Sequence, residues 1–260
     1  MAKTIAIVNQ KGGVGKTTTA INLSAALAQK DRRVLLVDLD SQSNATTGVG
    51  INRGFLEFNV YDCLIENAPV VDAIVRTDIV GLDVLPSTIE LAGLDLALSQ
   101  KPDREFVLYQ SLQSIKDRYD YVIIDCPPSL GLVTINALSA SQSVLIPVQC
   151  EFYALDGLTQ LLNTVRIVQN RLRPKARDLK IEGVLLTMLD NRNNFGYEIV
   201  SEVKKYFKEK VFKTIIPRNV QLQIAPSHGK SILQFSPNSR GAMMYRELAE
   251  EVLRHEKSTR

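Results

Sequence analysis

The residues of this chain that are best suited to chemistry lie in one short stretch, residues 10–18, which reads Gln-Lys-Gly-Gly-Val-Gly-Lys-Thr-Thr. Glycines at this spacing allow the backbone to curl so that successive N–H groups point at one anion. Lys16 would then reach the β- and γ-phosphates of a nucleotide, and the hydroxyl of Thr17 would ligate Mg²⁺. The stretch therefore predicts a phosphate-binding loop.

The segments on either side of this loop are those that such a site requires. An apolar run at residues 5–8 precedes the loop, and residues 19–30 carry apolar side chains at helical spacing. A strand, a glycine-rich turn and a helix in this order place the phosphates at the N-terminus of the helix. There, free N–H groups and the helix dipole favour an anion.

Carboxylates follow two other apolar runs. Asp38 and Asp40 follow the run that begins at residue 35, and Asp125 follows the run at residues 121–124. Ligands of an open parallel sheet bind beyond the carboxyl ends of its strands, so we expect all three carboxylates near the phosphate loop. The i, i+2 spacing directs Asp38 and Asp40 to the same side. We interpret the set as the half of a nucleotide site that organises Mg²⁺ and orients the attacking water.

Apolar runs alternate with helical patterns along the chain. Most runs are continuously apolar, which is typical of strands covered on both faces. The pattern predicts an α/β fold, a mostly parallel twisted sheet with helices on both faces, in a single domain that spans residues 1–260 and contains the phosphate-binding loop (P-loop). The expected strands are residues 4–9, 33–38, 82–86, 121–125, 143–148, 181–189 and 211–216; the expected helices are residues 16–30, 104–118, 133–139, 154–172, 197–208 and 241–255.

Composition argues against several other classes of protein. The chain has 260 residues, 45% of them hydrophobic, which is ample for a sizeable core. No apolar run approaches the roughly 18 residues that a membrane-spanning helix needs. The polar start, followed at once by a strand, predicts neither a signal peptide nor an N-terminal helix-turn-helix domain. Cys63, Cys126 and Cys150 are widely spaced and form no Cys-x-x-Cys motif, so we expect free thiols in a reducing cytoplasm.

The net charge of +3 conceals an asymmetry along the chain. Residues 166–230 contain fourteen Lys and Arg against six Asp and Glu, a local net charge of +8. Such a block is compatible with scattered solvated faces. It also indicates an anionic partner larger than a nucleotide, such as nucleic acid.

The phosphate loop departs from the common Gly-x-x-x-x-Gly-Lys-[Ser/Thr] pattern at its start. Gln10 stands where the first glycine is expected, and Lys11 adds a second lysine, which by itself could be a solvated charge beside the anion. The string Lys-Gly-Gly-Val-Gly-Lys-Thr-Thr instead resembles the deviant Walker A motif of the ParA/MinD ATPase superfamily. Residues 125–131, Asp-Cys-Pro-Pro-Ser-Leu-Gly, resemble its switch II.

Three further segments resemble the chromosomal ParA/Soj partition ATPases within that superfamily. They are residues 186–190, 216–220 and 225–230, so the resemblance covers essentially the whole chain. A departure lies in switch I, where Ser41 and Ser43 replace the Pro and Gly commonly found after the acidic pair.

This resemblance implies roles for individual residues. Lys11 would cross a dimer interface to the partner's nucleotide, Asp40 would position the hydrolytic water with support from Asp38, and Asp125 would hold the metal through water. The implied catalytic residues are Lys11, Lys16 and Asp40, and the implied Mg²⁺ residues are Thr17, Asp38, Asp40 and Asp125. The implied ATP contacts are Lys11, Gly12, Gly13, Val14, Gly15, Lys16, Thr17 and Thr18, with Met188, Pro217 and Asn219 beside the adenine; the implied DNA contacts are Arg192, Arg218, Lys230 and Arg240.

The function implied by the resemblance is an ATP-hydrolysing switch with slow intrinsic turnover that acts in chromosome or plasmid partitioning. ATP and Mg²⁺ would close a homodimer that binds double-stranded DNA without sequence preference. A ParB-type activator would stimulate hydrolysis to ADP and release the DNA. The protein would be cytoplasmic and associated with the nucleoid.

Two other functions occur on related folds. A MinD-like ATPase that cycles on a membrane needs a basic amphipathic C-terminal helix, whereas residues 246–256 hold four acidic residues and no aromatic one. An iron-protein reductase that shares one iron–sulfur cluster between two subunits needs two well-placed cysteines in each chain. Cys126 beside Asp125 is suggestive, but Cys63 and Cys150 lie in no cluster-loop context.

Overall fold

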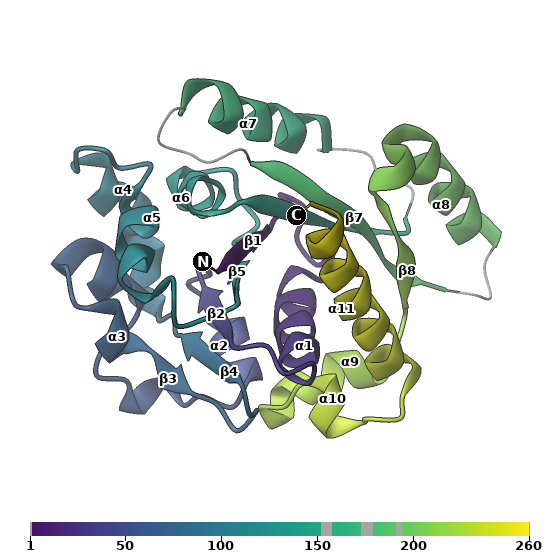
Figure 1. The fold of residues 1–260 in the computed structure, drawn as a ribbon, viewed down its shortest axis with the longest axis horizontal. Helices are drawn as coiled ribbons and strands as arrows, with labels where there is room; N and C mark the ends of the chain where they lie inside the picture. The colour runs from purple at the N-terminus through teal and green to yellow at the C-terminus, as the bar shows by residue number, and fades with distance from the viewer. Residues whose placement is uncertain (1, 152–157, 173–178, 191–193, 260) are drawn as a thin grey trace.

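The computed structural model describes residues 2–151, 158–172, 179–190 and 194–259. Within these residues eight strands form one sheet in the order β3-β4-β2-β5-β1-β6-β7-β8 (Figure 1). All neighbouring strands are parallel except β3, which runs antiparallel to β4. The strands are β1 Lys3–Ile7, β2 Val34–Asp38, β3 Val75–Arg76, β4 Leu82–Leu85, β5 Tyr121–Asp125, β6 Ser143–Gln149, β7 Lys180–Leu189 and β8 Val211–Pro217.

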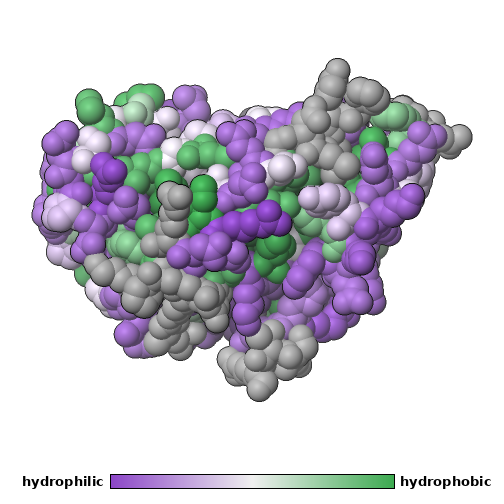
Figure 2. Space-filling view, turned by 90° about the horizontal axis from the view of Figure 1, so that it is seen from above, coloured by the Kyte–Doolittle hydropathy of each residue, from purple (hydrophilic) through white to green (hydrophobic). Residues whose placement is uncertain are grey.

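Helices connect the strands and cover the sheet (Figure 1). The longer ones are α1 Lys16–Ala28, α6 Leu132–Ala140, α7 Leu158–Arg171, α8 Asn194–Phe207 and α11 Arg240–Thr259; the shorter ones are α2 Asn44–Gly48, α3 Val70–Ala73, α4 Leu94–Ser99, α5 Val107–Leu112, α9 Val220–Ile224 and α10 Ile232–Phe235. No helix in the described part of the chain combines the length and the apolar character needed to cross a bilayer. On the face seen in Figure 2, hydrophobic groups lie scattered among hydrophilic ones, as is usual for a protein surface.

Two hydrophobic cores lie on opposite sides of the sheet. On β1, Ile5 and Ile7 belong to one core, whereas Ala6 belongs to the other, because successive side chains of a strand point to opposite faces. The first core also contains buried residues of α1 and α11, and the second contains those of α6 and α7. This arrangement confirms the prediction of a mostly parallel sheet with helices on both faces.

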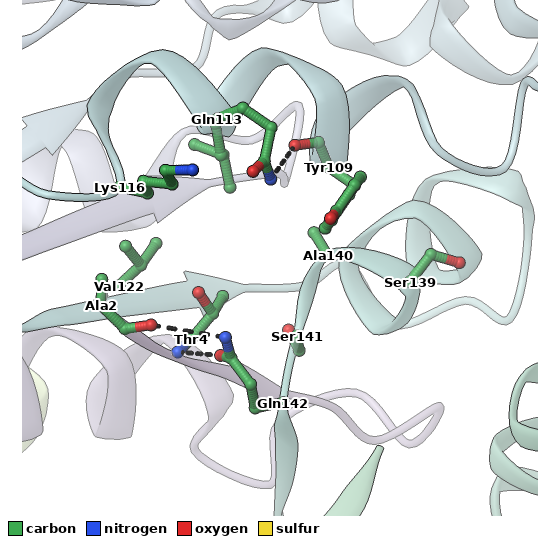
Figure 3. Close-up of a pocket in the computed structure, with 11 residues that line it drawn as sticks. Ala2, Thr4, Tyr109, Gln113, Lys116, Val122, Ser139, Ala140, Ser141 and Gln142 are labelled. Carbon is green, nitrogen blue, oxygen red and sulfur yellow. Dashed lines mark hydrogen bonds between the residues drawn. The ribbon is translucent and has the colours of Figure 1, made fainter. Parts of the chain in front are cut away.

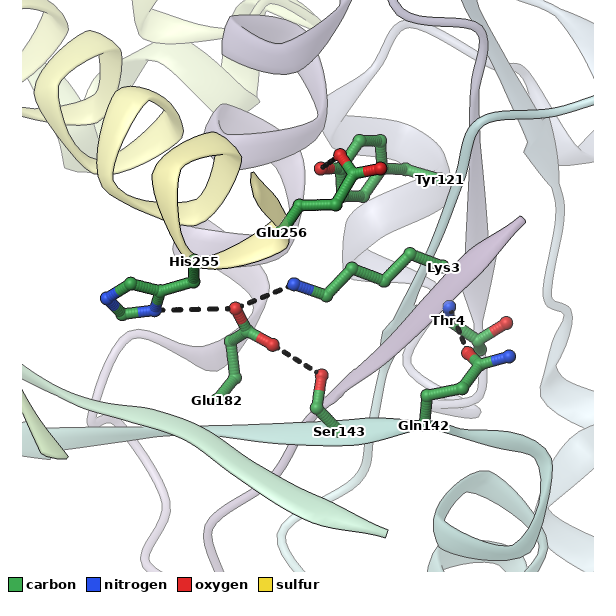
Figure 4. A network of polar contacts seen from close by, with 8 residues as sticks. All are labelled: Lys3, Thr4, Tyr121, Gln142, Ser143, Glu182, His255 and Glu256. Atoms are coloured by element: carbon green, nitrogen blue, oxygen red, sulfur yellow. Dashed lines mark hydrogen bonds and ion pairs between the residues drawn. The ribbon is translucent and has the colours of Figure 1, made fainter. Parts of the chain in front are cut away.

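The C-terminal part of α11 is held to the sheet by a polar network at the amino ends of the strands (Figure 4). Lys3 of β1 and His255 of α11 approach Oε1 of Glu182 to 2.8 and 3.6 Å, and the hydroxyl of Ser143 donates to Oε2 over 2.7 Å. Glu182 is buried, so these partners compensate for the loss of its hydration. The network lies at the opposite end of the sheet from the carboxyl ends of the strands.

Each of the seven predicted strands is present, with small differences at its ends. The sequence did not indicate β3, which has two residues and exists only through its pairing with Asp83 and Val84. The helix expected at residues 104–118 is reduced to α5 and a 3₁₀ turn at Gln113–Ile115. The short helices α2, α3, α4, α9 and α10 were not predicted, since four to six residues are too few to show a helical period.

Candidate functional site

The loop between β1 and α1 has the geometry of an anion cradle. Gly13 and Gly15 adopt φ angles of 73° and 89°, a left-handed conformation that glycine takes without strain, and Gly15 is the residue from which α1 begins. Asn9 holds the start of the loop, because its side chain accepts a hydrogen bond from the N–H of Lys11 and donates one to the carbonyl of Pro147. The N-terminus of α1 and the loop amides therefore face the same space beyond the sheet.

Lys16 is the buried cation of this loop. Its ammonium group donates to the carbonyl of Lys11 over 3.1 Å, so the side chain folds back over the loop. Burial lowers the pKa of Lys16, and the nearby Asp125, Cys126 and Asp40 act in the opposite direction. A buried ammonium with few protein partners is suited to bind phosphate oxygens.

Asp125 lies at the end of β5 and is completely buried. Neither of its carboxylate oxygens has a hydrogen-bond partner. Burial raises its pKa well above the usual range, and the charge of Asp38 raises it further; the neighbouring Thr17 hydroxyl and Lys16 ammonium act in the opposite direction. No hydrogen bond holds this buried carboxylate, and Thr17 and Lys16 offset the cost of its burial only in part, so a bound cation would stabilise it further.

Asp38 ends β2 and is directly paired with Asp125 across the sheet. Its Oδ2 atom accepts bonds from the N–H and the hydroxyl of Thr46, over 2.8 and 2.7 Å, and its Oδ1 atom accepts one from the N–H of Asp40 over 3.1 Å. Burial raises the pKa of Asp38 to about 6, and the hydrogen bonds from Thr46 and Asp40 oppose this rise. Asp38 is thus a well-supported carboxylate, whereas Asp125 is unsupported.

Asp40 begins the loop that joins β2 to α2. Its side chain is half-buried and accepts a bond from the N–H of Gln42 over 2.9 Å. Ser43 precedes α2 with a φ of 56°, a conformation that favours glycine and that a serine adopts at a cost of about 1 kcal/mol. The loop is therefore held in a tight turn beside the phosphate loop.

The donor set fits Mg²⁺ bound together with a nucleotide. In the described residues no three His, Cys, Asp or Glu side chains converge as a metal site made by the protein alone. Mg²⁺ is commonly held by one or two carboxylates together with substrate phosphates and water. The partnerless oxygens of Asp125 and the hydroxyl of Thr17 beside it supply this kind of ligand.

A pocket next to the phosphate loop contains the three residues assigned to the adenine. It is lined by Gly15, Thr18, Met188, Pro217 and Asn219, among others. Met188 has a φ of 55°, which is rare for a residue with a long side chain and is typical of functional sites. The hydroxyl of Thr187 donates to the carbonyl of Val14, so the end of β7 is tied to the loop.

Lys11, the extra lysine, makes an ion pair within its own chain. Its Nζ atom lies 3.7 Å from Oε2 of Glu151, just after β6, and about a third of the Lys11 side chain is exposed. The backbone N–H of Lys11 is bound to Asn9, so the loop position of the residue is fixed while its ammonium stays near the surface.

Of the four basic residues implied as DNA contacts, three lie in the described part of the chain. Arg218 and Arg240 line one open hollow of about 490 Å³ that adjoins the adenine-side pocket, and both are exposed. Lys230 is exposed at the end of the turn Ala225–His228. Arg192 lies outside the described residues.

A second pocket lies at the opposite end of the sheet, between β1 and α5 (Figure 3). It is bordered by Thr4, Gln113, Lys116 and Gln142. Its cavity volume of about 30 Å³ has room for no more than about two water molecules. The phosphate loop and the carboxylates of Asp38 and Asp125 all follow the carboxyl ends of strands, so we place the functional site at that edge of the sheet.

Several residues that support the site were not predicted from the sequence. They are Asn9, Thr46, Ser87, Glu151 and Thr187, and each contacts a residue of the phosphate loop or of the Asp38–Asp40 segment. Asn9 and Ser87 are polar residues that come soon after an apolar run, and this pattern could have indicated both of them from the sequence. The other contacts depend on strand order.

The chain is similar to several known proteins over most of its length. A family described as an AAA domain matches residues 2–181. The "Sporulation initiation inhibitor protein Soj" of Bacillus subtilis is 60% identical over 252 residues, which cover 97% of this chain and 98% of that protein. The "Chromosome-partitioning ATPase Soj" of Treponema pallidum is 47% identical over 253 residues, covering 97% and 98%.

A similar solved structure is that of a Mycobacterium smegmatis protein described as cobyrinic acid a,c-diamide synthase, with a bound ATP analogue and magnesium. It superposes with a TM-score of 0.87 and 38% identity, and covers 100% of this chain and 98% of the other. The identity to the Soj proteins over nearly the full length settles the relationship: the chain belongs to the ParA/Soj family of chromosome-partitioning ATPases.

Proposed function

We propose that this ATPase is a nucleotide-gated DNA-binding switch in partitioning. The observation that carries the proposal is the meeting of Lys16, Thr17 and the unsupported carboxylate of Asp125 at one end of the sheet, beside Asp38 and Asp40. A cation in the loop and a partnerless carboxylate together suit a phosphate chain with its metal ion. The ATP analogue and magnesium in the Mycobacterium smegmatis structure support the same ligands here.

The residues of the site divide the work of hydrolysis. The loop amides from Gly12 to Thr18 and the ammonium of Lys16 hold the phosphates and stabilise the charge that develops on them. Mg²⁺, held by Thr17 and Asp125 with Asp38 nearby, would neutralise phosphate charge when bound. Asp40 orients the attacking water. With no activating group added in this chain, turnover is slow.

The remainder of the mechanism concerns assembly. Two chains close around two ATP molecules, and Lys11 of each chain leaves Glu151 and crosses to the nucleotide of the other. Arg218, Lys230 and Arg240 of both chains then contact the phosphates of one DNA duplex without reading its sequence. A ParB-type activator stimulates hydrolysis, and the DNA is released.

Two observations favour this proposal over the other functions on this fold. Cys63, Cys126 and Cys150 are all buried within the single chain, so none of these thiols lies at the surface, where a cluster shared with a second subunit would need it. The greater identity to Soj proteins favours partitioning over the diamide synthase activity named for the Mycobacterium smegmatis protein.

Light scattering of the Asp40→Ala variant tests the proposal. The variant should bind ATP, fail to hydrolyse it, and double its mass when ATP and Mg²⁺ are added. A variant that stays monomeric with ATP, or that hydrolyses ATP at the normal rate, would contradict the proposed roles of the dimer and of Asp40.

A further inference from the structure

Thr46 lies completely buried in α2 and makes three hydrogen bonds near the site. Its N–H and its hydroxyl both donate to Asp38, and its hydroxyl oxygen accepts a bond from the N–H of Ser87 over 3.0 Å. An N–H group can only donate, so the hydroxyl proton is left for Asp38. The direction of both hydroxyl bonds is therefore fixed.

Ser87 follows β4 and contacts the Asp40 segment from the other side. Its hydroxyl donates to the carbonyl of Asp40 over 2.8 Å, and it is also completely buried. The N–H of Asp40 donates to Asp38 over 3.1 Å. Both main-chain groups of Asp40 are thus held: its N–H by Asp38, and its carbonyl by Ser87 and by the N–H of Ser43, which donates over 2.8 Å. Thr46 joins Asp38 and Ser87.

The position of the Asp40 main chain determines where its carboxylate lies. That carboxylate is near enough to Lys16 and Asp125 for its charge to act on both. A buried network in which every group has a partner favours one arrangement over others. Displacement of a catalytic group by about 1 Å can reduce a rate by roughly 100-fold.

We propose that Thr46 is a positioning residue for ATP hydrolysis, which fixes the Asp40 carboxylate through Asp38 and Ser87. The proposal rests on the role given above to Asp40 in orienting the attacking water. Thr46 does not touch the nucleotide, so it acts on the rate of hydrolysis rather than on ATP affinity.

Thr46→Val tests this directly, because valine has nearly the shape of threonine but cannot make the two hydroxyl bonds. We expect kcat to fall about 10- to 100-fold, with the affinity for ATP within about 3-fold of the wild-type value. Thr46→Ser should restore most of the rate. Thr47→Val is the matched control, since the Thr47 hydroxyl donates to the carbonyl of Ser43 and touches neither Asp38 nor Ser87; its kcat should stay near the wild-type value.

Ser87→Ala provides a second test that leaves the N–H bond to Thr46 in place. It should lower kcat by a smaller factor, and combining it with Thr46→Val should cost less than the product of the two separate factors, because both act through one network.

Normal kcat in Thr46→Val would overturn the proposal. So would a Thr46→Ser variant as slow as Thr46→Val, which would assign the effect to the methyl group, or a loss of ATP affinity as large as the loss of rate. The Asp40→Ala variant separates the two proposals. If it hydrolyses ATP normally, the proposed role of Asp40 has failed; if it is inactive while Thr46→Val is normal, only the inference about Thr46 has failed.

Discussion

Asp38 and Asp125 face each other across β2 and β5 as directly paired residues, and both are completely buried. They differ in their hydrogen bonds. Asp38 accepts three, from Thr46 and Asp40, whereas neither oxygen of Asp125 accepts any. Two neighbouring carboxylates, one supported and one unsupported, store a free-energy cost that a bound cation would relieve.

This difference predicts opposite effects of the same substitution at the two positions. Asp125→Asn should stabilise the nucleotide-free protein at neutral pH, because burial raises the pKa of this carboxyl and so makes its charged form costly in the folded state. Asp38→Asn should not stabilise the protein, because both oxygens of Asp38 accept a hydrogen bond from a main-chain N–H group. The NH₂ group of an asparagine would replace one of these oxygens and would face the N–H of Asp40 or of Thr46, which is also a donor. Urea unfolding of both variants without nucleotide checks the pair. A destabilised Asp125→Asn protein would contradict the unsupported state of this carboxylate.

The gain in the free energy of unfolding that Asp125→Asn produces should increase as pH rises. A carboxyl whose pKa is raised by folding binds more protons in the folded than in the unfolded state, so its contribution to stability falls as pH rises above the unfolded pKa. The asparagine variant has no carboxyl group that titrates at this position, so its free energy of unfolding does not fall for this reason as pH rises. The difference in free energy of unfolding between variant and wild type should therefore be near zero at acid pH and grow towards neutral pH. A constant difference would rule out this explanation.

Lys16→Ala should abolish nucleotide binding. The substitution removes the buried ammonium that folds over the loop and is placed to meet the phosphates. Titration calorimetry with ATP and Mg²⁺ measures the loss, and an unchanged melting temperature shows that the fold persists. Normal ATP affinity would refute the assignment of the phosphate loop.

Lys11→Ala should impair dimerisation and hydrolysis more than ATP binding to a single chain. Glu151→Gln is the informative companion, because it removes the ion pair that holds Lys11 within its own chain. Exposed pairs contribute at most about 1 kcal/mol each and two are broken per dimer, so the dissociation constant of the ATP-dependent dimer of Glu151→Gln should be lower by up to about 30-fold. Light scattering over a range of protein concentrations measures both. Normal dimerisation and activity in Lys11→Ala would leave Lys11 as a solvated charge.

The network around Glu182 should matter for stability and not for activity. Glu182→Ala leaves Lys3 and Ser143 without their buried partner, and we expect a loss of about 2–4 kcal/mol in the free energy of unfolding. Glu250→Ala breaks the exposed pair with Lys30 and should cost no more than about 1 kcal/mol. Denaturant unfolding compares the two, and ATP affinity should be unchanged in both. Equal losses would show that burial of Glu182 has no special effect.

The phosphate loop and the acidic strand ends could be predicted because their signals are local. The glycine-rich loop that contains Gly15 and Lys16 comes soon after an apolar run, and Asp38 and Asp125 each end one. The direct pairing of Asp38 with Asp125 could not be predicted, because it depends on β2 lying next to β5. The two strands start 87 positions apart, at Val34 and Tyr121, and this separation does not fix the strand order. The strand order is determined by the packing of helices and strands in both hydrophobic cores, which no local pattern in the sequence shows.

The residues that support the site could not be predicted from the sequence for the same reason. Thr46 and Ser87 are 41 residues apart and meet only because β4 lies beside β2. Glu151 appears in the sequence as an ordinary surface acid, and its contact with Lys11 arises where β6 ends next to β1. Contacts between strand ends from distant parts of a chain leave no local pattern.

The proposed switch requires that ATP gates DNA binding. Arg218, Lys230 and Arg240 would give each chain only a few contacts with DNA phosphates, and closing a dimer would double them along one duplex, which would raise the affinity as in a bivalent ligand. Arg218→Glu and Arg240→Glu should weaken binding to all duplexes alike and spare ATP hydrolysis measured without DNA.

Fluorescence anisotropy with random-sequence duplexes, in the presence of ATP, ADP or no nucleotide, measures whether ATP gates DNA binding. We predict tight binding with ATP alone, equal affinity for unrelated sequences, and a steep fall in bound fraction between about 50 and 200 mM salt. Equal affinity in all three nucleotide states, or strong preference for one sequence, would contradict the account.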